Sequence, residues 1–134
     1  MRTQEPTDSS RPRQGWNALK SAHYAFSGLM WIAPRTPSLK LAIAVSVALV
    51  GMGLLLRLAL VEIAVLILAA TLLLAVETLN TAVEMLCDHL HPEPHPQIGR
   101  IKDVAAAATA FCEIGTAFVV LLVLVPHVTR WFGH

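Results

Sequence analysis

The sequence predicts an all-α membrane protein with three transmembrane helices and one amphipathic helix at the membrane surface. Of its 134 residues, 55% are hydrophobic and only 14% are charged, and the mean hydropathy is +0.61. The apolar residues are gathered in three long runs, each of a length that suits a bilayer crossing. A soluble domain of this length would carry more polar surface, so the composition favours one membrane-embedded domain.

The amino-terminal part divides into a polar tail and an amphipathic helix. Residues 1–13 are rich in Pro, Ser and Thr, lack the apolar run of a cleavable signal, and are expected to form a disordered cytoplasmic tail. Residues 14–33 have apolar side chains at helical spacing, interrupted by polar ones, and are too polar to span the bilayer. This helix is therefore expected to lie in the interface. Three aromatic side chains are expected at headgroup level: Trp16, Tyr24 and Trp31.

Three segments are expected to cross the membrane: Leu39–Leu56, Leu60–Leu86 and Ile98–Val125. Gly51 and Gly53 allow close helix contact near the end of the first. A loop rich in His and Pro, at Asp88–Gln97, joins the second to the third. Pro126 is expected to end the third helix, because proline removes a backbone donor. The membrane domain is thus predicted to cover residues 14–126, with a short tail at 127–134.

The positions of the basic residues predict the orientation. Eight of the ten Lys and Arg residues lie before or at the start of the first span, or between the second and third spans, whereas Arg57 and Arg130 lie on the other side. Because cytoplasmic segments carry the excess of Lys and Arg, the amino end and the His-Pro loop are expected in the cytoplasm, with the chain in the cell membrane. The net charge of about +1, without a basic stripe, argues against a nucleic-acid partner.

A row of polar residues lies in the last third of the second span. Glu77, Asn80 and Glu84 are separated by three and four positions, which places them on one side of a helix, and Asp88 extends the row. Polar residues can also hold membrane helices together, which is the structural alternative. However, stacked carboxylates repel one another unless they share a proton or a cation. Oxygen ligands of this kind suit Mg²⁺, which often takes one or two carboxylates together with phosphate oxygens.

The segment after the loop adds positive charge to this acidic row. Arg100 and Lys102 follow the His-Pro loop at the start of the third span. A lysine, Mg²⁺ and a carboxylate base are together the parts of a phosphoryl-transfer site. A soluble cosubstrate could reach such a site from the cytoplasmic face.

These residues resemble the signature of the small prokaryotic lipid kinases, the diacylglycerol kinase and undecaprenol kinase family. The run Glu77-Thr78-Leu79-Asn80-Thr81-Ala82-Val83-Glu84-Met85-Leu86-Cys87-Asp88 is similar to E-x-x-N-[ST]-[AS]-[IV]-E-x-x-x-D. Lys102-Asp103, fourteen residues after Asp88, matches the second motif of the family. His23-Tyr24-Ala25-Phe26-x-Gly28 resembles the interfacial helix of the undecaprenol kinase branch. The resemblance covers roughly residues 16–126.

The resemblance implies a homotrimeric enzyme that transfers the γ-phosphate of ATP to the hydroxyl of a lipid, undecaprenol or diacylglycerol. It implies that Glu77 is the general base and that Glu84 binds Mg²⁺. The positions that match nucleotide-site residues are Asn80, Asp88, His95, Lys102 and Asp103. For His95, a solvated loop histidine is an equally good interpretation.

The chain also departs from the family pattern. Related kinases carry an acidic residue near the end of the surface helix, in register with Thr36 or Ala42, but here no Asp or Glu occurs between Asp8 and Glu62. A catalytically weak or inactive paralogue is therefore one alternative. Glu113 is the reverse case, an acid in the third span where relatives are apolar. A small proton- or cation-conducting oligomer is the other alternative, with carboxylates spread through the membrane depth.

Overall fold

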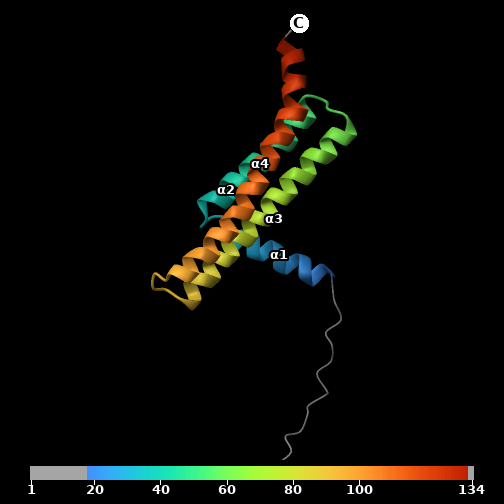
Figure 1. Ribbon diagram of the computed structural model, residues 1–134. Helices are drawn as coiled ribbons and strands as arrows, with labels where there is room; N and C mark the ends of the chain where they lie inside the picture. The colour runs from blue at the N-terminus through green and yellow to red at the C-terminus, as the bar shows by residue number, and fades with distance from the viewer. Residues whose placement is uncertain (1–17, 133–134) are drawn as a thin grey trace, which may run out of the picture.

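The computed structural model describes residues 18–132, which fold into four α-helices without strands (Figure 1). The helices are α1 (Ala18–Ile32), α2 (Pro37–Leu55), α3 (Leu60–Leu90) and α4 (Pro96–Phe132). The last three are long and apolar enough to cross a membrane. The prediction of an all-α membrane protein is thereby confirmed. The expected tail at 1–13, the expected anchor Trp16 and residues 133–134 lie outside the described residues.

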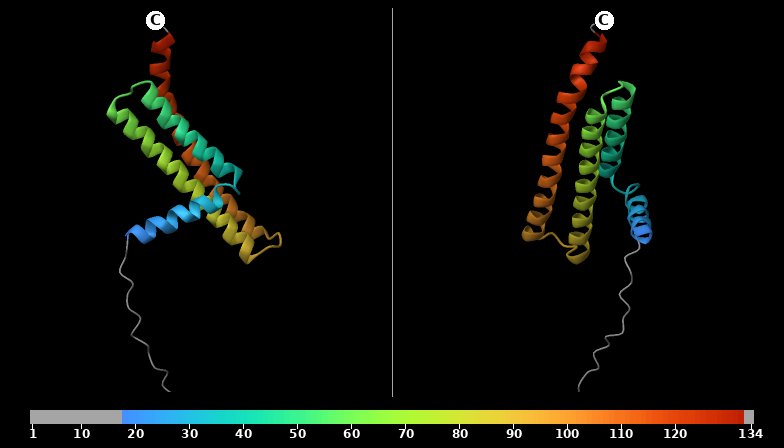
Figure 2. Two further views of the ribbon diagram at one scale, coloured as in Figure 1. Left: turned by 180° about the vertical axis from the view of Figure 1, so that it is seen from behind. Right: turned by 90° about the vertical axis from the view of Figure 1, so that its right-hand side faces the viewer.

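Helix α3 is the centre of the bundle. It packs against α2 on one side and α4 on the other, and each of these pairs is antiparallel because a short connection joins it (Figures 1 and 2). The carboxyl-terminal half of α3 and the amino-terminal half of α4 extend past the start of α2, toward the loop at residues 91–95. The polar row of α3 lies in this loop-side half.

Helix α1 runs across the direction of the long helices (Figure 2, left view). None of its residues is buried in the chain. Five of its large apolar side chains are each more than half exposed: Leu19, Tyr24, Phe26, Met30 and Trp31. Arg35, just after the helix, lies over the Trp31 ring, with its guanidinium carbon 4.6 Å from the ring centroid. The helix is confirmed, and its position at the membrane interface stays a prediction.

The boundary between α3 and the loop differs from the prediction. Helix α3 continues to Leu90, so Asp88 is part of the helix and not of the loop. The prediction was wrong because polar residues at the end of a long helix were interpreted as the beginning of a loop. The helix ends where proline first intervenes, since the residue before Pro92 is disfavoured in helical geometry. The backbone N–H of His91 closes the last turn on the carbonyl of Cys87, at 2.9 Å.

The sequence predicts that Pro126 ends the third long helix, but the structure shows that it does not. Helix α4 continues through Pro126 to Phe132, so the expected tail at 127–134 begins as helix. Proline is tolerated within membrane helices where neighbouring groups bond the backbone around it. Here Nδ1 of His127 lies 2.9 Å from the carbonyl oxygen of Val123, and Oγ1 of Thr129 donates to the carbonyl of Pro126 at 3.1 Å.

The end of the bundle opposite the His-Pro loop is closed by apolar packing. Leu49, Leu58, Leu66 and Leu124 form a buried cluster from α2, α3, α4 and the α2–α3 turn. The turn itself needs an unusual backbone at Arg57, whose φ is +53°. The next helix begins with the N–H of Ala59 donating to Oε2 of Glu62 at 2.8 Å.

The two glycines of α2 differ in their surroundings. A Cβ atom on Gly53 would lie 2.8 Å from Cδ1 of Leu66, a side chain that is fully buried on α3. A Cβ atom on Gly51 would meet nothing within 4 Å. Of the two glycines, only Gly53 is needed for the close contact between α2 and α3, because a side chain at this position would clash with Leu66.

Candidate active site

The polar row of α3 forms a gradient of burial. Glu77 is only 4% exposed, Asn80 and Glu84 are partly buried, and Asp88 is exposed near the loop. Glu77 and Thr81 are buried on the face between the neighbouring helices, and Oγ1 of Thr81 donates to the carbonyl of Glu77 at 3.0 Å. The row therefore leads from the interior of the bundle to the loop at residues 91–95.

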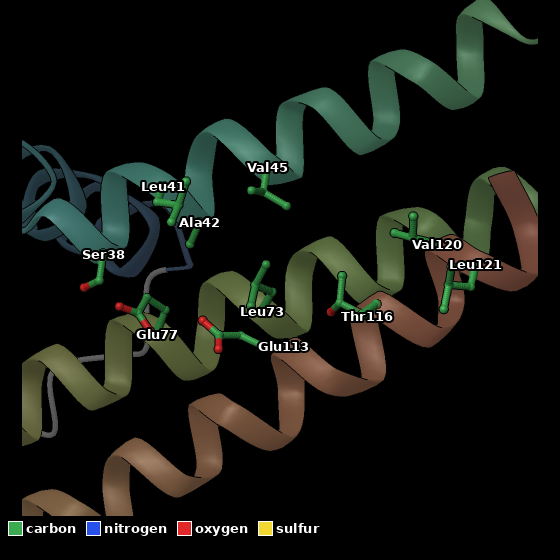
Figure 3. A pocket seen from close by; sticks show the side chains of 11 residues that line it. Ser38, Leu41, Ala42, Val45, Leu73, Glu77, Glu113, Thr116, Val120 and Leu121 are labelled. Carbon is green, nitrogen blue, oxygen red and sulfur yellow. The ribbon is translucent and has the colours of Figure 1, made fainter. Parts of the chain in front are cut away.

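Glu77 lies in the wall of an apolar groove between α2, α3 and α4 (Figure 3). The groove has a volume of about 420 Å³ and is lined mainly by aliphatic side chains, among them Leu41, Val45 and Leu121. Oε1 of Glu77 is buried and has no hydrogen-bond partner among the described residues. A buried carboxylate oxygen without a partner is costly. A ligand hydroxyl in this groove would supply the missing hydrogen bond.

Asn80 holds the carboxylate of Glu84 in place. Nδ2 of Asn80 donates to Oε1 of Glu84 at 3.0 Å, and Oδ1 of Asn80 is buried without a partner in the described part of the chain. Two oxygen atoms, the Asn80 carbonyl and the second carboxylate oxygen of Glu84, remain for a ligand. Such oxygens suit Mg²⁺.

Among residues 18–132 there is no group of three His, Cys, Asp or Glu side chains that could hold a metal ion by themselves. The residues fit Mg²⁺ only in its common mode, in which one or two protein oxygens are completed by water and phosphate oxygens. A metal at this site would therefore need ligands from outside the chain.

A second pocket lies at the loop, next to the exposed end of the polar row. Lys102 on α4 forms an ion pair with Asp88 on α3, with Nζ donating to Oδ1. Both residues line a pocket of about 550 Å³, together with His95 and Gly99. The fold thus brings Asp88, His95 and Lys102 into the wall of one pocket, and their role toward a nucleotide stays a prediction.

Two of the basic and acidic positions after the loop are not part of this pocket. Asp103 and Arg100 are exposed and do not line it. One residue of an α-helix is rotated by about 100° from the next, so Asp103 cannot share the direction of Lys102. His95 lies with its ring centroid 5.0 Å from that of His91, and its Nδ1 accepts from the N–H of Gln97 at 3.3 Å. Loop contacts therefore account for part of the position of His95.

The structure also places a residue whose role the sequence did not give. Glu113 on α4 lines the same groove as Glu77, and so do Ser38 and Thr116. The sequence did mark Glu113 as unusual, since it is an acidic residue in an apolar span. Its neighbour across the bundle could not be known without the packing of α4 on α3. Ala42, near the register position where related kinases carry an acid, is part of the groove wall.

Comparison with known proteins identifies the family of the chain. The pattern of the family described as prokaryotic diacylglycerol kinase matches residues 23–124, from α1 to the second half of α4. The chain belongs to this family. It is similar to a protein named diacylglycerol kinase from Synechocystis sp. (strain ATCC 27184 / PCC 6803 / Kazusa), with 30% identity over 111 residues, which are 82% of this chain and 63% of the relative. The chain therefore spans less than two thirds of that relative's length.

Proposed function

We propose that this protein is a membrane lipid kinase that transfers the γ-phosphate of ATP to the hydroxyl of diacylglycerol or undecaprenol. The observation that carries the proposal is the buried carboxylate of Glu77. It has an oxygen without a partner, lies in an apolar groove, and shares one helix face with Glu84 and Asp88. An apolar groove suits a lipid, and the loop-side pocket with Lys102 suits the phosphates of a nucleotide.

The nucleotide is expected at the loop-side end. The ion pair with Asp88 keeps Lys102 beside the pocket, and the phosphates of ATP would compete for its ammonium group. Asn80 and Glu84 would hold Mg²⁺ with their free oxygens. Bound there, Mg²⁺ would neutralise negative charge on the phosphate oxygens. Asn80 then has a positioning role, because its amide fixes the orientation of the Glu84 carboxylate.

The lipid hydroxyl is expected at Glu77. The oxygen of the hydroxyl forms the new bond to the γ-phosphorus, the bond from that phosphorus to the bridging oxygen breaks, and ADP leaves. The proton of the hydroxyl passes to Glu77. A carboxylate is a weak base toward an alcohol, so this transfer comes late, as the phosphoryl group is being transferred. The aliphatic walls of the groove exclude water, which would otherwise compete as the acceptor.

The distance between the two ends of the site is consistent with this division. Glu84 is seven residues after Glu77 on α3, which corresponds to about 10 Å along the helix. Two long side chains, a metal ion and a phosphoryl group are of a size to bridge it. The lipid would reach the groove from the membrane and the nucleotide from the loop.

The assembly and the location belong to the same proposal. We infer a homotrimer in the cell membrane, with the amino end and the His-Pro loop in the cytoplasm. Large apolar side chains on the outer face of α4 are well exposed in the single chain: Phe111, Phe118 and Leu122. Lipid or neighbouring copies must cover them, and Asp103, directed away from Lys102, would be free to complete a site in a neighbouring copy.

The direct test uses purified protein in lipid nanodiscs with Mg-ATP, supplied in parallel with diacylglycerol and undecaprenol. Transfer of labelled γ-phosphate to either lipid is expected, with loss of transfer when EDTA removes the divalent cation. Glu77→Gln protein of the same oligomeric state is the matched control. If neither lipid is phosphorylated by the wild-type protein, the kinase proposal is wrong.

One observation favours a second candidate. Glu113 adds a carboxylate deeper in the membrane than Glu77, as a proton- or cation-conducting oligomer would require. This function predicts ion flux into sealed vesicles that does not depend on ATP. Absence of flux in vesicles whose protein phosphorylates lipid would exclude it.

A further inference from the structure

Glu77 and Glu113 are two carboxylates in one apolar groove. They come from α3 and α4, and in Figure 3 the carboxylate of Glu113 is directed along the groove toward Glu77. Within the described residues, no Lys, Arg or His lines this groove. The oxygen of Glu77 that has no partner is buried in the same place. The groove therefore holds more hydrogen-bonding capacity than a bare hydrocarbon chain could use.

The two carboxylates lie at different depths. Glu77 is 13 residues before the end of α3 at Leu90, and Glu113 is 17 residues after the start of α4 at Pro96. At 1.5 Å per residue these positions are about 20 Å and about 26 Å from the loop. Glu113 is thus about one helical turn farther from the nucleotide pocket than Glu77. Beyond Glu113 the groove continues with Val120 and Leu121, which are apolar.

The charges of the pair restrict what Glu113 can do. Two carboxylates without a counter-charge in a medium of low dielectric constant repel one another unless they share a proton. Glu77 must be ionised to accept the proton of a lipid hydroxyl. A carboxyl group beside an ionised carboxylate is tolerated best in its neutral form, and a neutral carboxyl group donates a hydrogen bond. A donor at membrane depth needs an acceptor to avoid the cost of an unmade hydrogen bond.

We propose that Glu113 determines acceptor specificity by donating a hydrogen bond to an ester carbonyl of a glycerolipid whose free hydroxyl lies at Glu77. This inference rests on the proposed kinase function and names its acceptor as diacylglycerol. In diacylglycerol the nearer ester carbonyl is only a few bonds from the free hydroxyl, on the side of the acyl chains. That is the direction and roughly the spacing from Glu77 to Glu113.

The same geometry disfavours undecaprenol. With its hydroxyl at Glu77, a polyprenol presents only hydrocarbon at the depth of Glu113. The carboxyl group would then be covered by an apolar chain and would lose any hydrogen bond to water or lipid. A site built around a hydrogen bond rejects an analogue that lacks the partner group more strongly than an apolar site rejects a change of shape.

The test compares acceptors and variants in one cycle. Three proteins are assayed in nanodiscs: wild type, Glu113→Leu and Glu113→Gln. Each is given 1,2-diacylglycerol, undecaprenol, or the dialkyl ether analogue of diacylglycerol. The ether analogue lacks both carbonyls. For wild type we expect kcat/KM to be at least about tenfold higher for the ester than for the ether or the polyprenol. Glu113→Leu should lose this preference, and Glu113→Gln should keep most of it, because the amide also donates.

The outcomes separate this inference from the kinase proposal. The inference is wrong if wild type phosphorylates the ester and the ether equally, or if it prefers undecaprenol. It is also wrong if Glu113→Leu keeps the wild-type preference, because Glu113 then does not recognise the ester carbonyl. An equal loss on all three lipids, with a higher Mg²⁺ requirement, would also overturn it. If no lipid is phosphorylated, the kinase proposal fails and the specificity role fails with it. Glu62→Gln, a carboxylate removed outside the groove, is the control for a general effect of charge, and thermal melting checks that each variant is folded.

Discussion

The two ends of the α3–α4 pair differ in how their buried groups are satisfied. At the end away from the loop, Leu49, Leu58, Leu66 and Leu124 pack on one another, and the carboxylate of Glu62 accepts a hydrogen bond from the N–H of Ala59. At the loop-side end, Glu77 and Asn80 each keep a buried oxygen without a partner among the described residues. Packing that is complete adds stability, whereas unsatisfied polar groups cost stability and are retained where a ligand satisfies them.

The largest effect is expected from Glu77→Gln. The amide keeps the size of the side chain but cannot accept the proton of the lipid hydroxyl, so lipid phosphorylation should fall by about 10²- to 10⁴-fold. Thermal stability in detergent should be unchanged or higher, because an uncompensated buried carboxylate is removed. Turnover close to that of wild type would remove Glu77 as the base.

The next effect concerns the ion pair at the loop. Lys102→Ala should raise KM for ATP by about 10- to 100-fold, the value of a hydrogen bond to a charged group, with less effect on KM for lipid. Asp88→Asn frees the lysine from its partner and serves as the comparison variant. An ATP dependence that Lys102→Ala leaves unaltered would place the nucleotide elsewhere.

At the packed end, Leu66→Ala should act in the opposite way. Leu66 is fully buried, and the cavity left by its removal should cost about 2 kcal/mol of stability, since packing rather than transfer from water holds membrane helices together. The change should be visible as a lower melting temperature, with kcat of the folded enzyme retained. A loss of kcat without a loss of stability would contradict the division between the two ends.

The smallest effect is expected from substitution of the two glycines of α2. Gly53→Ala brings a methyl group to 2.8 Å from Leu66 and should cost about 1 kcal/mol, because the leucine must shift in a packed cluster. Gly51→Ala, two residues away, faces open space and should be neutral or slightly stabilising, because alanine favours helix. Equal melting temperatures for the two variants would mean that the α2–α3 contact at Gly53 is not tight.

Much of the molecule could be predicted from the sequence because the relevant signals are local. Helix length follows from runs of apolar residues, and the shared face of Glu77, Asn80 and Glu84 follows from the helical repeat. The place of Lys102 near the acidic row follows from a short loop that returns the chain antiparallel to itself, whereas its ion pair with Asp88 came only from the structure. The helix boundaries were less well predicted. The sequence predicted loop at the polar end of α3 and a helix end at Pro126, but α3 continues to Leu90 and α4 continues through Pro126.

Only the tertiary structure determines which residues that are distant in the sequence line the same groove or come into contact. The sequence showed that Glu113 is unusual, but its place opposite Glu77 depends on the rotation and depth of α4 against α3. The difference between Gly51 and Gly53 likewise depends on the approach of Leu66 from another helix. Periodicity determines which face of a helix is polar or apolar, since that is a property of the helix alone. The partner of each face is determined by packing, which involves all the helices together.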